Sequence, residues 1–175
     1  MVTEAQDEGH PAGWPEKRLL QDCLVRRTRH GGPGGQHRNK VETAIEIVHQ
    51  PSGIVAGAVE RRSQEANRGV AVDRLRLLLA VRVRTVRSGE VTPSDLWIQR
   101  CPRQRIVCSE GHADFPGLLA EALDAILAKE FDVARAAAAL GCSATQLIRF
   151  VSRVAEALEW VNTERQARGL RRLHA

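Results

Sequence analysis

Residues Gly31 to Gln36 read Gly-Gly-Pro-Gly-Gly-Gln, and no other stretch of the chain is better suited to chemistry. Four glycines around one proline leave the backbone almost bare of side chains, so it can enter a narrow space. The segment ends in a single polar amide, Gln36, and the cations Arg38 and Lys40 follow it. A thin loop of this kind is suited to delivering backbone N–H and amide groups into a pocket lined by RNA.

Other interpretations of the glycines fit less well. A flexible linker does not explain why strand patterning returns abruptly at Ala44. A phosphate-binding loop of the Walker type needs G-x-x-x-x-G-K-[ST], and no Lys-Ser or Lys-Thr follows the glycines. A dinucleotide fingerprint needs a helix that opens at its third glycine, and no helical pattern follows.

Two stretches of the sequence resemble the catalytic domain of class I peptide chain release factors: GPGGQHRNKVETAIEI and PSGIVAGAVERRSQEANRGVAVDRLRLLL. Within that group the resemblance is closest to the short ribosome-rescue hydrolases that lack codon-reading domains. It covers residues 20–87 and includes two motifs in the same order. The first motif is Gly34-Gly35-Gln36, and the second is Arg62-Ser63-Gln64 with Asn67 further along. Two separate motifs make the resemblance specific.

The resemblance implies hydrolysis of the ester between a nascent peptide and its transfer RNA, in the peptidyl transferase centre of the large ribosomal subunit. Water would attack the ester carbonyl, and the backbone N–H of Gln36 would donate to the developing oxyanion. The side-chain amide of Gln36 would orient or exclude nucleophiles, because an uncharged amide is not a strong base. A Cβ at Gly34 or Gly35 would displace the donor. The ribosome and the transfer RNA supply the rest of the site, so no cofactor is implied.

The same resemblance implies that polar residues of the two matched segments contact ribosomal RNA: Arg38, Asn39, Lys40, Arg61, Arg62, Ser63, Gln64, Asn67 and Arg68. The cluster is a stronger indication than any one member, because a single surface arginine is usually a solvated charge. Arg38 departs from the family, which commonly has a small apolar residue at that position.

Positive charge is concentrated around these motifs. The net charge is +5, yet residues 16–87 hold fifteen Lys and Arg against seven Asp and Glu, whereas residues 88–175 hold eleven of each. This segregation is expected of a face that meets phosphates, although Arg outnumbers Lys 23 to 3 and an Arg-rich proteome would also raise the charge. Three Trp, three Phe and no Tyr argue against a protein that reads RNA by stacking bases.

The sequence around the loop predicts the elements that position it: a small α+β domain over residues 16–87, with a mixed sheet and one long helix. Period-two apolar patterns predict three strands, at residues 22–29, 44–49 and 54–59. Ser63 can cap the long helix, whose apolar face is formed by Ala71, Leu75, Leu78 and Leu79.

The rest of the chain predicts a tail, a connection and a helical unit. Residues 1–15 hold Gly, Pro and acids without periodicity, which indicates a mobile tail. Gly, Pro and Ser punctuate residues 88–113, which are interpreted as a connection. Residues 114–175 have helical periodicity. Asp114, Asp132 and Ser143 can each cap a helix there, and the third of these helices carries Leu147, Ile148, Val151, Ala155 and Leu158.

Residues 132–153 have the spacing of a helix-turn-helix, with Gly141 in the turn. An ordinary helical hairpin with a small apolar core is the favoured alternative. The helix-turn-helix nevertheless supplies a rival function, that of a non-enzymatic RNA- or DNA-binding protein. Substitution of Gln36 separates the two functions, because only the hydrolase depends on it.

The cysteine spacing and the hydropathy of the chain argue against three classes of protein: disulfide-rich scaffolds, common zinc fingers and membrane-spanning proteins. Cys23, Cys101, Cys108 and Cys142 are too scattered for a disulfide scaffold. Cys101, Cys108 and His112 form C-x6-C-x3-H, which fits no common zinc finger and leaves zinc as the minor alternative to reduced cysteines. No apolar run approaches the roughly 20 residues that span a bilayer, and the acidic N-terminus does not resemble a targeting signal.

We therefore expect a monomer in the cytoplasm, with the ribosome and peptidyl-tRNA as partners and no membrane. A chain of 175 residues leaves no room for codon-reading domains, which favours rescue of stalled ribosomes or of split large subunits. Its last residues hold four arginines rather than the long Lys/Arg-rich tail that many small rescue hydrolases place in the empty mRNA channel: Arg165, Arg168, Arg171 and Arg172.

Overall fold

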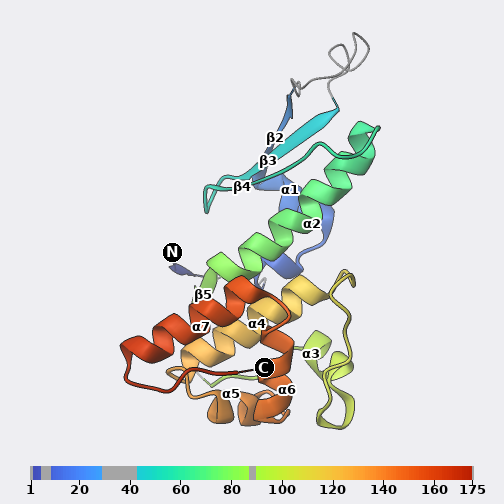
Figure 1. Cartoon of the computed structure of the whole chain (residues 1–175). Coiled ribbons are helices and arrows are strands. Elements are labelled where there is room, and N and C mark those ends of the chain that lie inside the picture. Colours follow the sequence, from blue (N-terminus) through green and yellow to red (C-terminus); the bar gives the residue numbers. More distant parts are fainter. Residues whose placement is uncertain (1, 5–8, 29–42, 87–89, 175) are drawn as a thin grey trace. The chain divides into compact units, whose positions relative to one another are not determined.

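The structure is a computed structural model of the chain, and it describes residues 2–4, 9–28, 43–86 and 90–174 (Figure 1). Contacts between residues divide the chain into two compact units. We call residues 14–79 the sheet unit, and residues 1–13 together with 80–175 the helical unit. The predicted α+β class is confirmed, since a small antiparallel sheet occurs together with many helices.

The sheet unit holds three strands that pair in the order β2-β3-β4. The strands are β2 (Cys23–Thr28), β3 (Ala44–His49) and β4 (Ile54–Ala58). Both pairings are antiparallel, so this sheet is not the mixed sheet that was predicted. The turn between β3 and β4 is only four residues long, and a parallel pair needs a crossover of about a dozen residues or more.

Two helices complete the sheet unit, α1 (Glu16–Gln21) and α2 (Gln64–Arg82), of which α2 extends past residue 79 into the helical unit. Alternate residues of β3, Ile45 and Ile47, are buried, as the period-two pattern requires. On α2 the predicted face is confirmed, with Ala71, Leu75 and Leu79 fully buried. The cores of strand and helix thus follow the two apolar periods of the sequence.

The helical unit contains a parallel pair of strands, β1 (Val2–Glu4) and β5 (Arg84–Val86). Its helical elements are η1 (Pro11–Gly13), α3 (Asp95–Arg100), η2 (Pro102–Gln104), α4 (Phe115–Ala128), α5 (Val133–Ala139), α6 (Ala144–Val151) and α7 (Ala155–Ala167). Helix α4 is the centre of this unit, because nearly every residue from Phe115 to Ile126 is buried. No helix in the described ranges is both long and apolar enough to cross a bilayer.

Aromatic and ionic contacts fix the core of the helical unit. The Phe150 ring meets Trp97 and Phe115 edge-on, with ring centroids 6.1 and 5.2 Å away. Arg84 forms a buried ion pair with Asp124 at 3.0 Å. Burial lowers the pKa of Arg84 to about 10, which still leaves its guanidinium charged at neutral pH.

Three segments of the helical unit differ from the sequence-based interpretation. The helix predicted to run from Ser143 through Leu158 ends at Val151, and α7 begins at Ala155. Helix α3 lies within residues 88–113, and its cap Ser94 is held in turn by the carboxylate of Glu121. Residues 11–13, which were predicted to belong to a mobile tail, form η1 and pack against α4, where the Gly13 and Gly117 backbones approach closely.

Candidate catalytic and RNA-binding site

The β2–β3 hairpin brings together the two points at which the chain leaves the sheet before the glycine-rich segment and returns to it afterwards. Thr28, at the end of β2, is the ladder partner of Ala44, at the start of β3. Paired Cα atoms in an antiparallel ladder are about 4.5–5.5 Å apart, so the chain leaves the sheet and returns to it at neighbouring points. The catalytic candidates and three RNA-binding candidates lie between these points, outside the described residues: Gly34, Gly35, Gln36, Arg38, Asn39 and Lys40.

Asn67 ties this returning strand to the second motif. Its side-chain amide nitrogen donates to the carbonyl oxygens of Thr43, at 2.6 Å, and of Arg61, at 3.0 Å. Its Oδ1 accepts the backbone N–H of Arg61 at 2.8 Å. The side chain is fully buried, so its surroundings are protein backbone rather than a surface open to RNA. One buried amide therefore connects the second motif to Thr43, the first described residue after the glycine-rich segment.

Arg61 and the remaining residues of the second motif, Arg62 to Gln64, are less buried than Asn67. Arg61 and Arg62 are exposed, and neither forms an ion pair with an acidic residue in the described ranges. Ser63 is exposed but has a structural use, because its Oγ accepts the N–H of Ala66 at 3.1 Å and so caps α2 as predicted. Gln64, the first residue of α2, is partly buried. Of this motif, the two arginines are the side chains available to phosphates.

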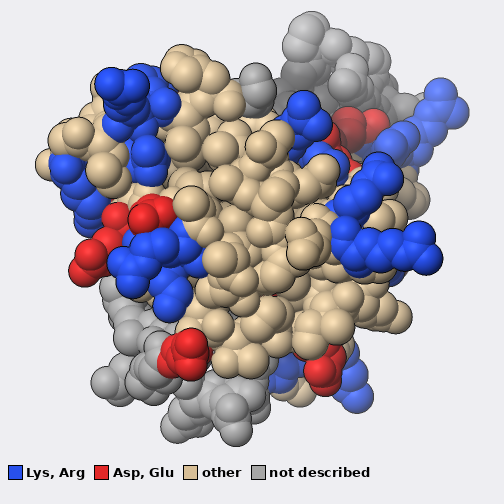
Figure 2. Space-filling model, turned by 90° about the horizontal axis from the view of Figure 1, so that it is seen from below, with Lys and Arg blue, Asp and Glu red and all other residues tan. Residues whose placement is uncertain are grey.

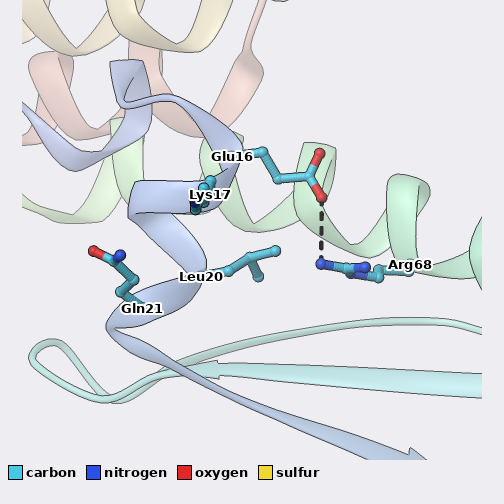
Figure 3. A pocket seen from close by; sticks show the side chains of 5 residues that line it. All are labelled: Glu16, Lys17, Leu20, Gln21 and Arg68. Atoms are coloured by element: carbon cyan, nitrogen blue, oxygen red, sulfur yellow. Dashed lines mark ion pairs between the residues drawn. The ribbon is translucent and has the colours of Figure 1, made fainter.

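Arg68 borders a shallow pocket of about 480 Å³ between α1 and α2 (Figure 3). Its guanidinium points toward the Glu16 carboxylate at 3.7 Å, and Leu20 extends into the space below them. A second carboxylate, Glu65, lies 4.0 Å from Arg68. Two acidic neighbours offset the charge that Arg68 would offer to RNA, which distinguishes it from Arg61 and Arg62.

A second anchor holds the turn that carries the arginines. Arg74 donates to the carbonyl oxygen of Gly57 at 2.7 Å and pairs with Glu60. Hydrogen bonds from the backbone N–H groups of Val59 and Glu60, together with Arg74, lower the pKa of the Glu60 carboxyl. The segment from Val59 to Ser63 is thus held by Arg74 on one side and by Asn67 on the other.

Sequence reasoning missed the partners of the motif residues. The Thr43 carbonyl is the acceptor that connects Asn67 to the chain just before β3, and a backbone oxygen leaves no trace in residue identity. Glu16 forms an ion pair with Arg68, and Arg74 forms one with Glu60. The first pair is 52 residues apart in the sequence and the second is 14 residues apart, so no periodic pattern indicates either pairing.

The zinc alternative gains no support from the described residues. Among them no group of three or more His, Cys, Asp or Glu side chains is arranged to hold a metal ion. His112 bonds instead to Arg100, at 3.0 Å, and to the N–H of Asp114. Burial raises the pKa of Cys142 to about 12, and it raises that of Cys101 as well. Burial thus favours the neutral thiol form of both cysteines in the metal-free protein.

Chelation tests this point directly. Treatment with EDTA is expected to leave the unfolding midpoint of the purified protein unchanged, because a structural zinc ion would contribute folding free energy that chelation removes. Thermal unfolding followed by circular dichroism, with and without chelator, checks it. A lower midpoint after chelation, restored by added zinc, would contradict the expectation.

Comparison with known proteins assigns the segment that contains both motifs. Residues 20–95 match the family described as RF-1 domain. The chain is 42% identical over 71 residues to peptide chain release factor 1 of Caldicellulosiruptor bescii, a match that covers 41% of this chain and 20% of the relative. It is 54% identical over 56 residues to peptide chain release factor 1 of Chlorobaculum tepidum, covering 32% and 16%.

A plant relative gives the same assignment. Peptide chain release factor PrfB1, chloroplastic, of Arabidopsis thaliana is 44% identical over 71 residues, which is 41% of this chain and 16% of the relative. The chain thus spans a fifth or less of the length of these relatives. The match to the RF-1 domain covers most of the sheet unit and the first residues after it, from 20 to 95. Residues 20–95, which hold both the Gly-Gly-Gln motif and the Asn67 contacts to Thr43 and Arg61, are therefore similar to the RF-1 domain of peptide chain release factors.

Proposed function

We propose that this chain hydrolyses the peptidyl-tRNA ester on the ribosome, in the peptidyl transferase centre of the large subunit. The observation that supports the proposal is the match of residues 20–95, which include Gly34-Gly35-Gln36, to the RF-1 domain, together with the hydrogen bond by which Asn67 holds Thr43 where the chain returns to the sheet. Thr28 and Ala44 are ladder partners, so the segment that carries Gln36 leaves the sheet and returns to it at one place. The chain would work as a monomer in the cytoplasm, where the ribosome and peptidyl-tRNA are its partners.

In this mechanism the protein supplies a donor and a shape. The Gln36 backbone N–H stabilises the oxyanion that forms when water attacks the ester carbonyl, and the Gln36 side-chain amide orients the nucleophile. Gly34 and Gly35 keep that N–H in line because they lack a Cβ. The proton released by water goes to the ribose oxygen of the leaving transfer RNA, so the step balances without a further reactant.

We extend the proposal to codon-independent release, in the rescue of stalled ribosomes or of split large subunits. Its support is that the described residues after the matched segment form part of one helical unit centred on α4. Peptide release measured on three complexes tests it: ribosomes stalled on truncated mRNA, ribosomes with a stop codon in place, and isolated large subunits carrying peptidyl-tRNA. Release that required a stop codon would overturn codon independence, and no release from any complex would overturn the hydrolase.

The contribution of Arg61 and Arg62 is expected to appear as a salt effect. Removing both charges in Arg61→Ala/Arg62→Ala should weaken ribosome binding and lower the slope of log affinity against log salt by about two, because each phosphate contact releases counterions. Binding measured at several salt concentrations checks it. The control is Arg168→Ala/Arg172→Ala, which removes two arginines that are already paired with Glu164 and Glu159. Equal slopes in both double variants would exclude the second motif as an RNA contact.

A further inference from the structure

Helices α5 and α6 form a short helix–turn–helix pair that the proposed function does not use. Gly141, in the turn between them, has φ 68°, a left-handed conformation that favours glycine. The Ser143 side chain accepts the N–H of Gln146 at 3.2 Å, so α6 begins at a capped residue. Leu147 and Phe150 of α6 are buried, which places Arg149 on the opposite, exposed side.

A groove of about 600 Å³ is lined by this side of α6 and by residues 105–110. Three arginines line it, Arg105, Arg149 and Arg153, against one acid, Glu110. Arg153 is oriented by a hydrogen bond to the carbonyl oxygen of Cys108 and by the Phe150 ring, whose centroid lies 5.4 Å from the guanidinium carbon. We call this surface the α6 groove.

The α6 groove carries a net positive charge, although residues 88–175 as a whole hold equal numbers of acidic and basic residues. The eleven acids of residues 88–175 are largely engaged elsewhere: Asp114 pairs with Arg100 at 2.7 Å, and Glu164 pairs with Arg168. Within the described ranges no acid forms an ion pair with Arg105 or Arg149. Pairing within the fold thus leaves a local excess of two positive charges that the sequence total conceals.

We propose that the α6 groove binds the phosphate backbone of an RNA helix. A guanidinium presents a planar fork of donors that matches phosphate oxygens, and Gln146 adds an amide within reach of a ribose hydroxyl. The aromatic ring of the groove, Phe150, is only 1% exposed, so bases cannot stack on it and contacts to the backbone are favoured. Figure 2 shows the face on which α5 and α6 lie, where Lys and Arg side chains gather at opposite margins of a broad uncharged surface.

The choice of RNA rests on the proposed function, which places the chain on the ribosome. The phosphate chemistry by itself would also fit a DNA duplex. Binding to the α6 groove would hold the chain on its substrate without touching the ester, so it should change affinity and leave the rate of the chemical step unaltered.

The test uses the full chain and the variant Arg105→Ala/Arg149→Ala. The probes are intact stalled ribosomes, a short RNA duplex and a DNA duplex of the same sequence. Affinity for ribosomes and for the RNA duplex is expected to fall about tenfold, and the salt slope to drop by about two, because two phosphate contacts are lost. Release at saturating protein should stay at the parent rate. Gln146→Glu, which adds a repelling charge without removing a buried contact, should weaken binding in the same direction.

The matched control is again Arg168→Ala/Arg172→Ala, with the same change in net charge in the same unit. Unchanged affinity in Arg105→Ala/Arg149→Ala, or an equal loss in the control, overturns the α6 groove as a binding site. Tighter binding of the DNA duplex than of the RNA duplex overturns the assignment to RNA. A chain that releases no peptide, but whose RNA affinity still depends on Arg105 and Arg149, would refute the proposed function and leave the groove standing.

Discussion

Replacing Gly35 by alanine is expected to slow peptide release by about 10²–10³-fold, the loss that follows removal of one oxyanion-hole donor. The added Cβ would push the neighbouring Gln36 N–H away from the oxyanion, which exists only as the reaction proceeds. Ribosome binding should therefore be nearly unchanged. Single-turnover release at saturating protein, together with a separate binding measurement, checks both halves of this expectation.

Gly69→Ala provides the matched control for this variant. Gly69 lies in α2 of the same unit, and a Cβ built there meets nothing within 4 Å. The substitution should leave release unaltered and stabilise the helix by about 0.5–1 kcal/mol, because alanine loses less conformational freedom than glycine. If Gly35→Ala lost binding and release in equal measure, the loop would be a docking element rather than the source of a transition-state donor.

Asn67→Ala is expected to lower the release rate by about 10²-fold even though the residue cannot touch the substrate. Its loss removes the hydrogen-bond partner of the Arg61 N–H and of the Thr43 carbonyl, two partly buried groups, and each lost bond is worth about 0.5–1.5 kcal/mol. Thr43 would then be free to shift, and in the proposed mechanism a displacement of about 1 Å in the loop that it follows can cost that much in rate. Release rates and the free energy of unfolding, measured on the same preparation, check the expectation.

Asn162→Ala separates this positioning role from general destabilisation. Asn162 is also buried, and its amide likewise holds a backbone segment, through the N–H and carbonyl of Leu173. It lies in the helical unit, so its substitution should lower stability without slowing release at saturating protein. Equal losses of activity in the two variants, in proportion to their instability, would show that Asn67 supports the fold alone.

The parts of the fold that follow apolar periodicity were predictable from the sequence. Strand β3 covers the predicted residues 44–49, because Ile45 and Ile47 alternate with residues that face away from the core. The long helix begins after Ser63, whose hydroxyl oxygen accepts a hydrogen bond from a backbone N–H group in the first turn of α2. Local chemistry decided these elements, so local patterns were sufficient to find them.

The break between α6 and α7 was not predictable in the same way. Ile148, Val151, Ala155 and Leu158 continue one helical period across residues 152–154, where the structure has a turn. Two helices that bury residues against the same core can share such a period without being continuous. Helix α3 escaped notice for a different reason, since the Glu121 carboxylate that fixes its cap comes from α4, 27 residues away.

The sequence predicted which residues belong to the candidate site, but not which of them are joined to one another by hydrogen bonds. The sequence placed Arg61, Arg62 and Asn67 together as RNA contacts, and the structure separates them into exposed cations and a buried amide. The distinction depends on the Thr43 carbonyl, which every residue type would provide. No reading of side-chain identity can detect a partner that is part of the backbone.

Because Asn67 stands in the first turn of α2, its hold on Thr43 and Arg61 is linked to the end of a helix, where hydrogen bonds open most readily. Leu75 and Leu79, deep in the core, report on a different event, which is loss of the whole sheet unit. Heating would therefore fray one turn before it melts the domain. Catalysis would stop at the lower of these two temperatures, so a thermal shift assay would overestimate the range over which the protein works.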